Sequence, residues 1–100
     1  MKEMALNQMI QQCETTSQTL KLLAHPRRLQ LLCHLSEGKK TVGELEKLCA
    51  VSQSQISQFL QRMKSEGLVR SERDGKYMSY VILDPKILKL IQALHRIFCP

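Results

Sequence analysis

The chain has 100 residues, with 15 Lys and Arg against 9 Asp and Glu, for a formal net charge of +6. This length predicts one small domain, and no apolar run approaches the roughly 20 residues of a membrane span. The N-terminal stretch MKEMALNQMIQQ lacks the continuous apolar core of a signal peptide, so we expect a cytoplasmic protein that does not contact a membrane. The excess positive charge favours a phosphate-rich partner such as nucleic acid.

Helical patterns dominate the chain before residue 41. Residues from about 2 to 24 fit a helix, although Thr15-Thr16-Ser17 predicts a break in its middle. Pro26 suits the first turn of a further helix because its missing N–H is not needed there. That helix is expected from Arg27 to about Ser36, and it ends at Glu37-Gly38.

Two short helices joined by a tight turn are predicted next. Thr41-Val-Gly-Glu44 and Ser52-Gln-Ser-Gln55 both fit S/T-x-x-E/Q, the capping box that starts a helix. The first helix is expected over Val42 to Leu48. The second is expected from Gln53 to about Glu66, and it stops at Gly67. The pattern is that of a helix-turn-helix.

The second of these helices has two different faces. Its apolar stripe consists of Ile56, Phe59, Leu60 and Met63. The opposite face is expected to be uncharged and consists of Ser54, Ser57, Gln58 and Gln61. Such amides and hydroxyls can bond to base edges in the major groove. A merely solvated polar face is the alternative, but the capped helix before it and the basic hairpin after it favour a recognition helix.

After Gly67 the period of the hydrophobic pattern changes from that of a helix to about two residues, which is typical of β-strands. Residues 68–73 and 76–82 are strand-like and flank Asp74-Gly75, a strong signal for a two-residue hairpin turn. Arg70 lies on the first strand, and Arg73 and Lys76 lie beside the tip, which suits a wing that approaches DNA. Protection of an edge strand by charge is the alternative. A last helix is expected from Asp84-Pro85, with an apolar stripe too wide for one neighbour.

These elements predict a mainly α fold with a small β-hairpin, a winged helix-turn-helix with added N- and C-terminal dimerisation helices. We expect a single domain over 1–100, a DNA-reading unit over 41–82, and dimerisation helices over about 2–24 and 85–99. A two-fold dimer would place two recognition helices on a pseudo-palindromic double-stranded DNA operator. The candidate DNA-binding residues are Thr41, Ser52, Gln53, Ser54, Gln55, Ser57, Gln58, Gln61, Arg73 and Lys76.

Three segments resemble the ArsR/SmtB family of dimeric bacterial repressors: LLAHPRRLQLLCHL, TVGELEKLCAVSQSQISQFLQRMKSEGLV and RDGKYMSYVI. Family members release DNA when an inducer binds, and metals are the best-known inducers. The family's Cys-Val-Cys metal motif corresponds here to Thr41-Val42-Gly43, which has no thiolates. Its zinc or nickel site in the last helix is matched only in part, by Asp84 and His95. A closed zinc site needs four donors, so neither a metal nor any other cofactor is expected.

The four cysteines indicate a different input. The placement of Cys33 in LQLLCHL and Cys99 in HRIFCP resembles the sulfide- and persulfide-responsive subgroup of the family, of the BigR, SqrR and HlyU type. That resemblance implies that Cys33 and Cys99 sense reactive sulfur species by forming an intrachain disulfide or polysulfide bridge, which lowers DNA affinity. The alternative for Cys33 is a small buried core residue beside Leu29 and Leu32.

Other functions stay open at this point. Cys33 and Cys99, with Cys13 as a third ligand, would suit a metalloid such as arsenite. A winged-helix module that binds protein instead of DNA is a different class. An enzyme is not expected, because the chain has neither a Gly-rich phosphate loop nor an evident catalytic triad. Cys49 is expected in the core, and the three histidines are expected to be structural or surface residues. The sequence leaves open whether DNA binding represses genes or relieves repression.

Overall fold

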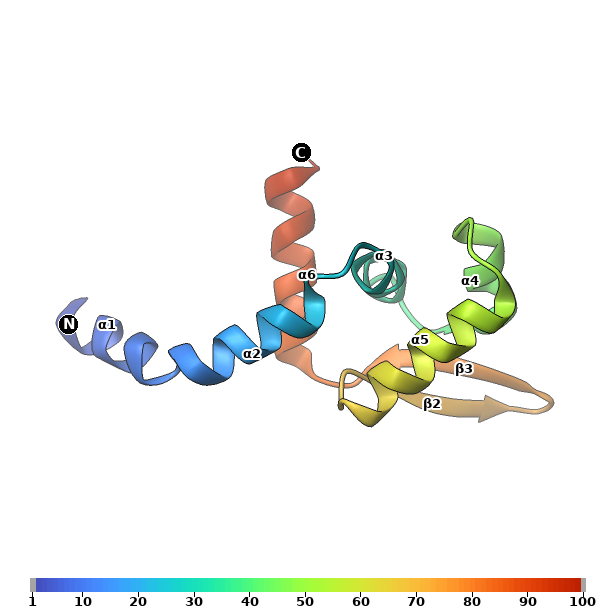
Figure 1. Ribbon diagram of the computed structural model, residues 1–100, viewed down its shortest axis with the longest axis horizontal. Coiled ribbons are helices and arrows are strands. Elements are labelled where there is room, and N and C mark those ends of the chain that lie inside the picture. Colours follow the sequence, from blue (N-terminus) through green and yellow to red (C-terminus); the bar gives the residue numbers. More distant parts are fainter. Residues whose placement is uncertain (1, 100) are drawn as a thin grey trace.

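A computed structural model describes residues 2–99, so Met1 and Pro100 of the predicted domain lie outside the described residues. Its elements in chain order are α1 (Lys2–Gln11), α2 (Cys13–Leu23), α3 (Pro26–Leu35), β1 (Lys40–Thr41), α4 (Val42–Leu48), α5 (Gln53–Ser65), β2 (Val69–Asp74), β3 (Tyr77–Ile82) and α6 (Pro85–Phe98). In Figure 1, α1 and α2 extend to one side, α6 stands near the middle, and α4, α5 and the hairpin occupy the other side. The predicted winged helix-turn-helix fold is confirmed.

The helices begin where side chains satisfy free backbone N–H groups. Before α3, Nδ1 of His25 accepts from the Arg27 N–H at 3.2 Å, and Pro26 is the first helical residue. Thr41 and Glu44 form the complete, reciprocal capping box predicted for α4. At α5 only half of the predicted box forms. The Ser52 hydroxyl accepts from the Gln55 N–H at 3.3 Å, whereas the Gln55 amide oxygen meets that hydroxyl instead of the backbone.

The break in the N-terminal helix lies at Gln12, between α1 and α2, and the predicted break at Thr15-Thr16-Ser17 is wrong. These hydroxyl residues are accommodated inside α2. Ser17 Oγ donates to the Glu14 carbonyl oxygen at 2.9 Å, and Thr19 Oγ1 donates to the Thr15 carbonyl oxygen at 3.2 Å. Because hydroxyl side chains can bond back to the preceding helical turn, their presence does not end the helix.

The hairpin turn lies one residue later than predicted. Asp74 pairs with Tyr77 at the end of the β2–β3 ladder, so the two turn residues are Gly75 and Lys76. Gly75 has φ +62°, and none of the described non-glycine residues has a positive φ. A glycine at the first central position is what a type II′ turn requires. The sheet also has a third strand that the sequence did not indicate, β1, which pairs with β3 in the order β1-β3-β2.

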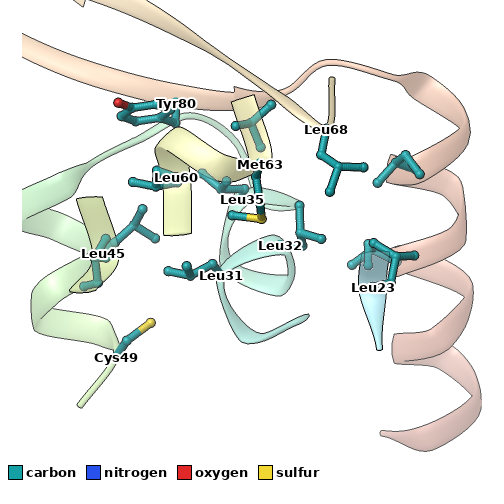
Figure 2. Close-up of a cluster of buried hydrophobic side chains, with 14 residues drawn as sticks. Leu23, Leu31, Leu32, Leu35, Leu45, Cys49, Leu60, Met63, Leu68 and Tyr80 are labelled. Atoms are coloured by element: carbon teal, nitrogen blue, oxygen red, sulfur yellow. The ribbon is translucent and has the colours of Figure 1, made fainter. Parts of the chain in front are cut away.

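One hydrophobic core joins α3, α4, α5, the sheet and α6, and Leu23 joins it from the end of α2. In Figure 2, Leu45 and Cys49 lie at one end of this core, and Leu68 and Leu23 lie near α6 at the other. The predicted apolar stripe of α5 is confirmed for Ile56, Leu60 and Met63, whose exposed fractions are all 0%. Burying each such side chain contributes about 1.5–3 kcal/mol, which fixes the face that α5 turns outward.

The two terminal helices carry apolar side chains that the single chain does not cover. Leu6 and Ile10 of α1 are 60% and 57% exposed, and Ile97 and Phe98 of α6 are 67% and 76% exposed. Ile87 and Ile91, in contrast, bury the other part of the α6 stripe. None of the helices within residues 2–99 is long and apolar enough to cross a membrane.

Candidate nucleic-acid interface and cysteine pair

The outward face of α5 presents most of the amides and hydroxyls predicted for DNA recognition. Exposed residues on this helix include Gln53, Ser54, Gln55, Gln58 and Gln61, while Ser57 is half-buried. The Gln61 amide nitrogen lies 3.4 Å from the Tyr80 hydroxyl of β3, so this side chain also joins α5 to the sheet. The first two turns of α5 therefore offer the most accessible hydrogen-bonding groups.

One cation on this face was missed by the sequence analysis, which described the face as uncharged. Arg62 is exposed on α5. It follows Gln58 by four residues, a spacing that places both side chains on the same side of a helix. The helical spacing from Gln58 was enough to place Arg62 on this face. The prediction of an uncharged face is therefore wrong, because the face includes the Arg62 cation.

Two of the predicted DNA-binding residues have a structural role at the helix starts. Thr41 Oγ1 accepts from the Glu44 N–H at 3.1 Å, and the Thr41 N–H donates to Glu44 Oε1 at 3.0 Å. The hydrogen bond from the Thr41 backbone is the main reason why the pKa of the Glu44 carboxyl is lowered. Ser52 caps α5 in the same way through its hydroxyl. The Thr41 hydroxyl, which only accepts here, still has a proton to donate outward, whereas the Ser52 hydroxyl already donates to the Gln55 amide oxygen.

The position of α5 is fixed by an ion pair between helices. Arg28 of α3 is 8% exposed. Its Nη1 lies 2.8 Å from Glu66 Oε1, Nη2 donates to Glu66 Oε2 at 3.3 Å, and Nη1 also donates to the Leu22 carbonyl oxygen at 3.1 Å. Glu66 is the C-cap of α5. One guanidinium thus connects the end of α2, the start of α3 and the end of the recognition helix.

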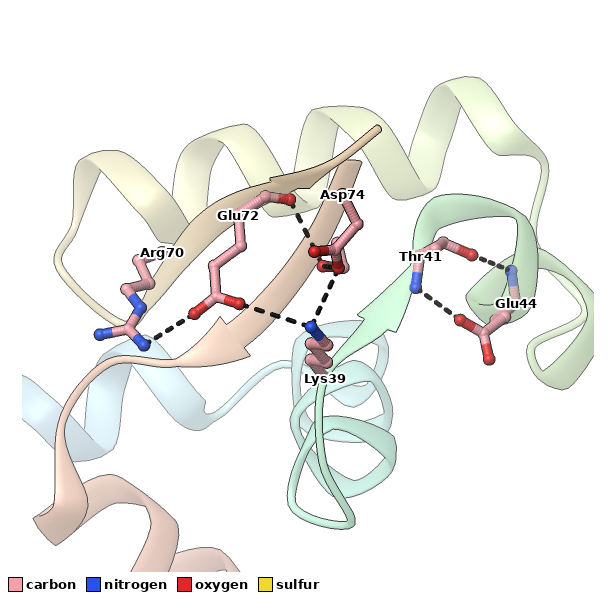
Figure 3. A network of polar contacts seen from close by, with 7 residues as sticks. Lys39, Thr41, Glu44, Arg70, Glu72 and Asp74 are labelled. Atoms are coloured by element: carbon pink, nitrogen blue, oxygen red, sulfur yellow. Dashed lines mark hydrogen bonds and ion pairs between the residues drawn. The ribbon is translucent and has the colours of Figure 1, made fainter. Parts of the chain in front are cut away.

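The wing carries an ion-pair network, shown in Figure 3. Lys39 Nζ lies 2.9 Å from Asp74 Oδ2 and 3.8 Å from Glu72 Oε2, and Arg70 Nη2 lies 2.8 Å from Glu72 Oε1. The hydrogen bond and positive charge of Lys39 lower the pKa of the Asp74 carboxyl, and Asp74 in turn raises the pKa of Lys39. Both acidic side chains of the wing are therefore neutralised by nearby cations.

Arg73 and Lys76, the two predicted phosphate contacts of the wing, are exposed. Neither takes part in an ion pair with any other described residue. Lys76 Nζ lies 5.8 Å from the centre of the Tyr77 ring. Because Lys39 and Arg70 balance the wing carboxylates, the charges of Arg73 and Lys76 remain available at the tip.

The cysteines fall into two environments. Cys49 is 3% exposed, which confirms that it belongs to the core. Cys13, Cys33 and Cys99 are exposed free thiols, so the interpretation of Cys33 as a buried core residue is wrong. The physical reason is that Leu31, Leu32 and Leu35 supply the inward face of α3, which leaves Cys33 on the side of the helix that faces away from the core.

Cys33 lies on α3 and Cys99 lies at the end of α6, and these two helices pack against each other. Partial burial raises the pKa of the Cys33 thiol, and the negative charge of a Cys99 thiolate raises it further. Cys99 is the C-cap of α6, where its N–H donates to the His95 carbonyl oxygen at 2.8 Å. An open cavity of about 660 Å³ beside Cys33 is also lined by His34, Ser36, Glu37, Gln92, His95 and Arg96.

The structure does not assemble the three-cysteine set considered for a metalloid. Within residues 2–99, no three His, Cys, Asp or Glu side chains come together as a metal site. Cys13 instead donates its thiol hydrogen to the Met9 carbonyl oxygen at 3.3 Å in the N-terminal helices.

The fold and the polar outward face of α5 define a winged helix-turn-helix protein of the DNA-binding class. The family model described as "Bacterial regulatory protein, arsR family" matches residues 25–71. Over 80 residues, the chain is 42% identical to the biofilm growth-associated repressor of Agrobacterium fabrum, in a match that covers 80% of this chain and 68% of that protein. The chain therefore belongs to the ArsR family of bacterial transcriptional regulators, in the group that includes BigR and HlyU.

Two solved structures agree with this assignment. The transcriptional repressor BigR from Xylella fastidiosa has a TM-score of 0.86 and 36% identity, over 94% of this chain and 96% of that one. The transcriptional regulator HlyU from Vibrio vulnificus CMCP6 also has a TM-score of 0.86, with 33% identity, over 95% of this chain and 99% of that one.

Proposed function

We propose that the protein is a homodimeric repressor whose operator affinity falls when reactive sulfur species bridge Cys33 and Cys99. The observation that carries the proposal is that Cys33 on α3 and Cys99 at the end of α6 are exposed free thiols on two helices that pack against each other. The names of the relatives from Agrobacterium fabrum and Xylella fastidiosa support the role of repressor.

Operator recognition is assigned to α5, its capped start and the wing. Base edges would be met by Gln53, Ser54, Gln55, Ser57, Gln58 and Gln61, and phosphates by Thr41, Ser52, Arg73 and Lys76. The support is the exposure of most of these side chains and the absence of ion-pair partners for the wing tip cations within residues 2–99. Hydrogen bonds to bases supply specificity, whereas phosphate contacts supply position and much of the affinity.

Dimerisation is supported by the apolar side chains of α1 and α6. Leu6, Ile10, Ile97 and Phe98 are all more than half exposed in the single chain. Exposed apolar side chains concentrated on two helices are typical of a protein interface, and a two-fold dimer would bury both sets at once. A dimer also gives the recognition helices the fixed spacing that a palindromic operator needs.

The sulfur step uses both thiols and an external persulfide, R–SSH. The thiolate of one cysteine attacks the outer sulfur of R–SSH, releasing R–SH and leaving a persulfide on the protein. The thiolate of the other cysteine then attacks the inner sulfur of this persulfide, which gives a Cys33–Cys99 disulfide and releases hydrogen sulfide. Two thiols are oxidised by two electrons, and the transferred sulfur is reduced to sulfide. A second R–SSH can add one further sulfur and give a trisulfide, with two molecules of R–SH and one of hydrogen sulfide released in total.

A bridge between Cys33 and Cys99 would act on DNA affinity through the scaffold. It would tie α3 to α6, and α3 also holds the end of α5 through the Arg28–Glu66 ion pair. Because α6 carries part of the proposed dimer surface, the bridge would change how each recognition helix sits relative to its partner's. An operator tolerates little change in that spacing.

Serine variants test this proposal, with operator affinity measured by fluorescence anisotropy before and after persulfide treatment. Cys33→Ser and Cys99→Ser should bind the operator as the reduced wild type does and should lose the response to persulfide. Cys13→Ser is the matched control, because Cys13 is also an exposed thiol and should leave the response intact. An undiminished response in both Cys33→Ser and Cys99→Ser would refute the sensing assignment.

A further inference from the structure

A cavity of about 530 Å³ lies between the recognition helix and the helices that precede it. Its lining residues come from the end of α2, the start of α3 and the middle of α5; they are Lys21, Leu22, Ala24, His25, Arg28, Gln55, Gln58, Phe59 and Arg62. We infer that this cavity receives a backbone phosphate of the operator and that Lys21 and Arg62 hold it from opposite sides. The inference rests on the DNA binding of the proposed function and extends the DNA interface outside residues 41–82.

The charge of the cavity is entirely positive. Three of its lining residues, Lys21, Arg28 and Arg62, are cations, and the lining includes no carboxylate. Arg28 is already balanced by the carboxylate of Glu66. Lys21 and Arg62 are exposed, and the ion pairs found within residues 2–99 involve neither of them. The cavity therefore has two cations available for an external anion.

The position of the cavity connects it to the DNA. Gln55 and Gln58 line the cavity and also belong to the exposed face of α5 that is proposed to read bases. A strand that passes over this face therefore brings its phosphates to the mouth of the cavity. Glutamine amides and Arg and Lys side chains are among the groups that bond to phosphate oxygens in protein–DNA complexes.

The walls of the cavity are held in place by packing. The rings of His25 and Phe59 lie 5.2 Å apart between their centres, which joins the start of α3 to α5. The bidentate contact of Arg28 with Glu66 joins the same helices nearby. Because these contacts fix the start of α3 relative to α5, only the side chains of Lys21 and Arg62 have to be ordered when a phosphate arrives.

Salt dependence of operator binding tests the inference, because each lost phosphate contact should lower the slope of log K against log salt by about 0.9. The variants are Lys21→Ala, Arg62→Ala and their double variant, in the reduced protein. Because Lys21 and Arg62 hold the same phosphate, only the double change removes the whole contact. Extrapolated from 1 M to 0.15 M salt, the double change should weaken binding about fivefold and each single change by a smaller factor. The loss should be equal on operator and on unrelated DNA of the same length, since phosphates carry no sequence. Lys89→Ala, an exposed cation on α6, is the control and should change neither slope nor affinity.

The outcomes separate this inference from the proposed function. If the reduced wild type binds operator but both single variants keep its slope and affinity, the phosphate clamp is wrong and the proposed function stands. If the reduced wild type does not prefer operator, the proposed function fails and the clamp fails with it. Inorganic phosphate is the third arm. If phosphate weakens DNA binding more than chloride of the same ionic strength and does so only when Lys21 and Arg62 are present, phosphate competes with the DNA backbone for the cavity, as the clamp predicts. An equal effect of phosphate on the wild type and the double variant would place the competition elsewhere and contradict the clamp.

Discussion

Arg28→Met tests whether the ion pair between α3 and α5 holds the recognition helix in place. Methionine keeps most of the aliphatic length of arginine and removes its charge and its hydrogen bonds. In the native chain this guanidinium contacts both carboxylate oxygens of Glu66 and the Leu22 carbonyl oxygen. The substitution leaves Glu66 Oε1, an atom with almost no contact with solvent, without its cation.

The expected loss follows from how deeply the pair is buried. The side chains of Arg28 and Glu66 are 10% and 23% exposed. Removing one partner of a buried pair costs about 3–5 kcal/mol because the remaining charge is uncompensated. The partial exposure of Glu66 places this case at the lower end, so we expect a loss of about 3 kcal/mol in the free energy of unfolding. For a domain of this length, such a loss lowers Tm by about 12–24 °C.

Chemical denaturation followed by circular dichroism measures this loss at a fixed protein concentration. Arg70→Met is the matched control, because the Arg70–Glu72 pair has the same 2.8 Å separation but side chains that are 57% and 34% exposed. An exposed pair contributes at most about 1 kcal/mol. In Arg28→Met/Glu66→Met the buried charge is absent, so part of the stability should return. Equal losses for Arg28→Met and Arg70→Met would refute the argument from burial.

Three further predictions concern single side chains. Thr41→Ala removes the N-cap of α4 and should lower the free energy of unfolding by about 1 kcal/mol in a urea titration; an unchanged midpoint would contradict the role of the cap. Cys49→Ser places a hydroxyl in the core and should cost about 1–3 kcal/mol, whereas Cys13→Ser at the surface should stay within about 0.5 kcal/mol of the wild type. Because its pKa is raised, the Cys33 thiol becomes thiolate only at higher pH than an ordinary cysteine, so its alkylation rate should still rise with pH where a free cysteine has levelled off. Cys99→Ser removes one cause of the raised pKa and should move this alkylation profile to lower pH; a profile that does not move would show that the two thiols are not coupled.

The sequence predicted the elements that have strong local signals. The caps at Thr41, Ser52 and Asp84 marked the starts of α4, α5 and α6 to the residue, because each cap satisfies a backbone donor locally, whereas α3 begins at Pro26, one residue before the predicted Arg27. The position of the hairpin turn and the presence of β1 were harder to predict, because both depend on interactions beyond the local sequence. The hairpin turn moved to Gly75-Lys76 because a type II′ turn needs glycine first, and β1 forms only through its pairing with β3.

The candidate site was predicted in part for similar reasons. Helical periodicity identified most of the polar face of α5 but was not applied to Arg62. The exposure of Cys33 depends on which side of α3 meets the core, and a helix with leucines at 29, 31, 32 and 35 does not decide this by itself. The basic cavity joins Lys21 to Arg62 across two helices. No local pattern links residues so far apart in the chain, so only the packed fold brings them together.

The most direct test of the central claim is the operator dissociation constant of the bridged protein, measured in parallel with its intact mass. Persulfide-treated protein is separated from reduced protein, and each fraction is titrated with operator at the same salt concentration. We predict that the fraction whose mass corresponds to a Cys33–Cys99 disulfide or trisulfide binds operator at least tenfold more weakly, and that a dithiol reductant restores both mass and affinity. Bridged protein that binds operator as tightly as reduced protein would contradict the account.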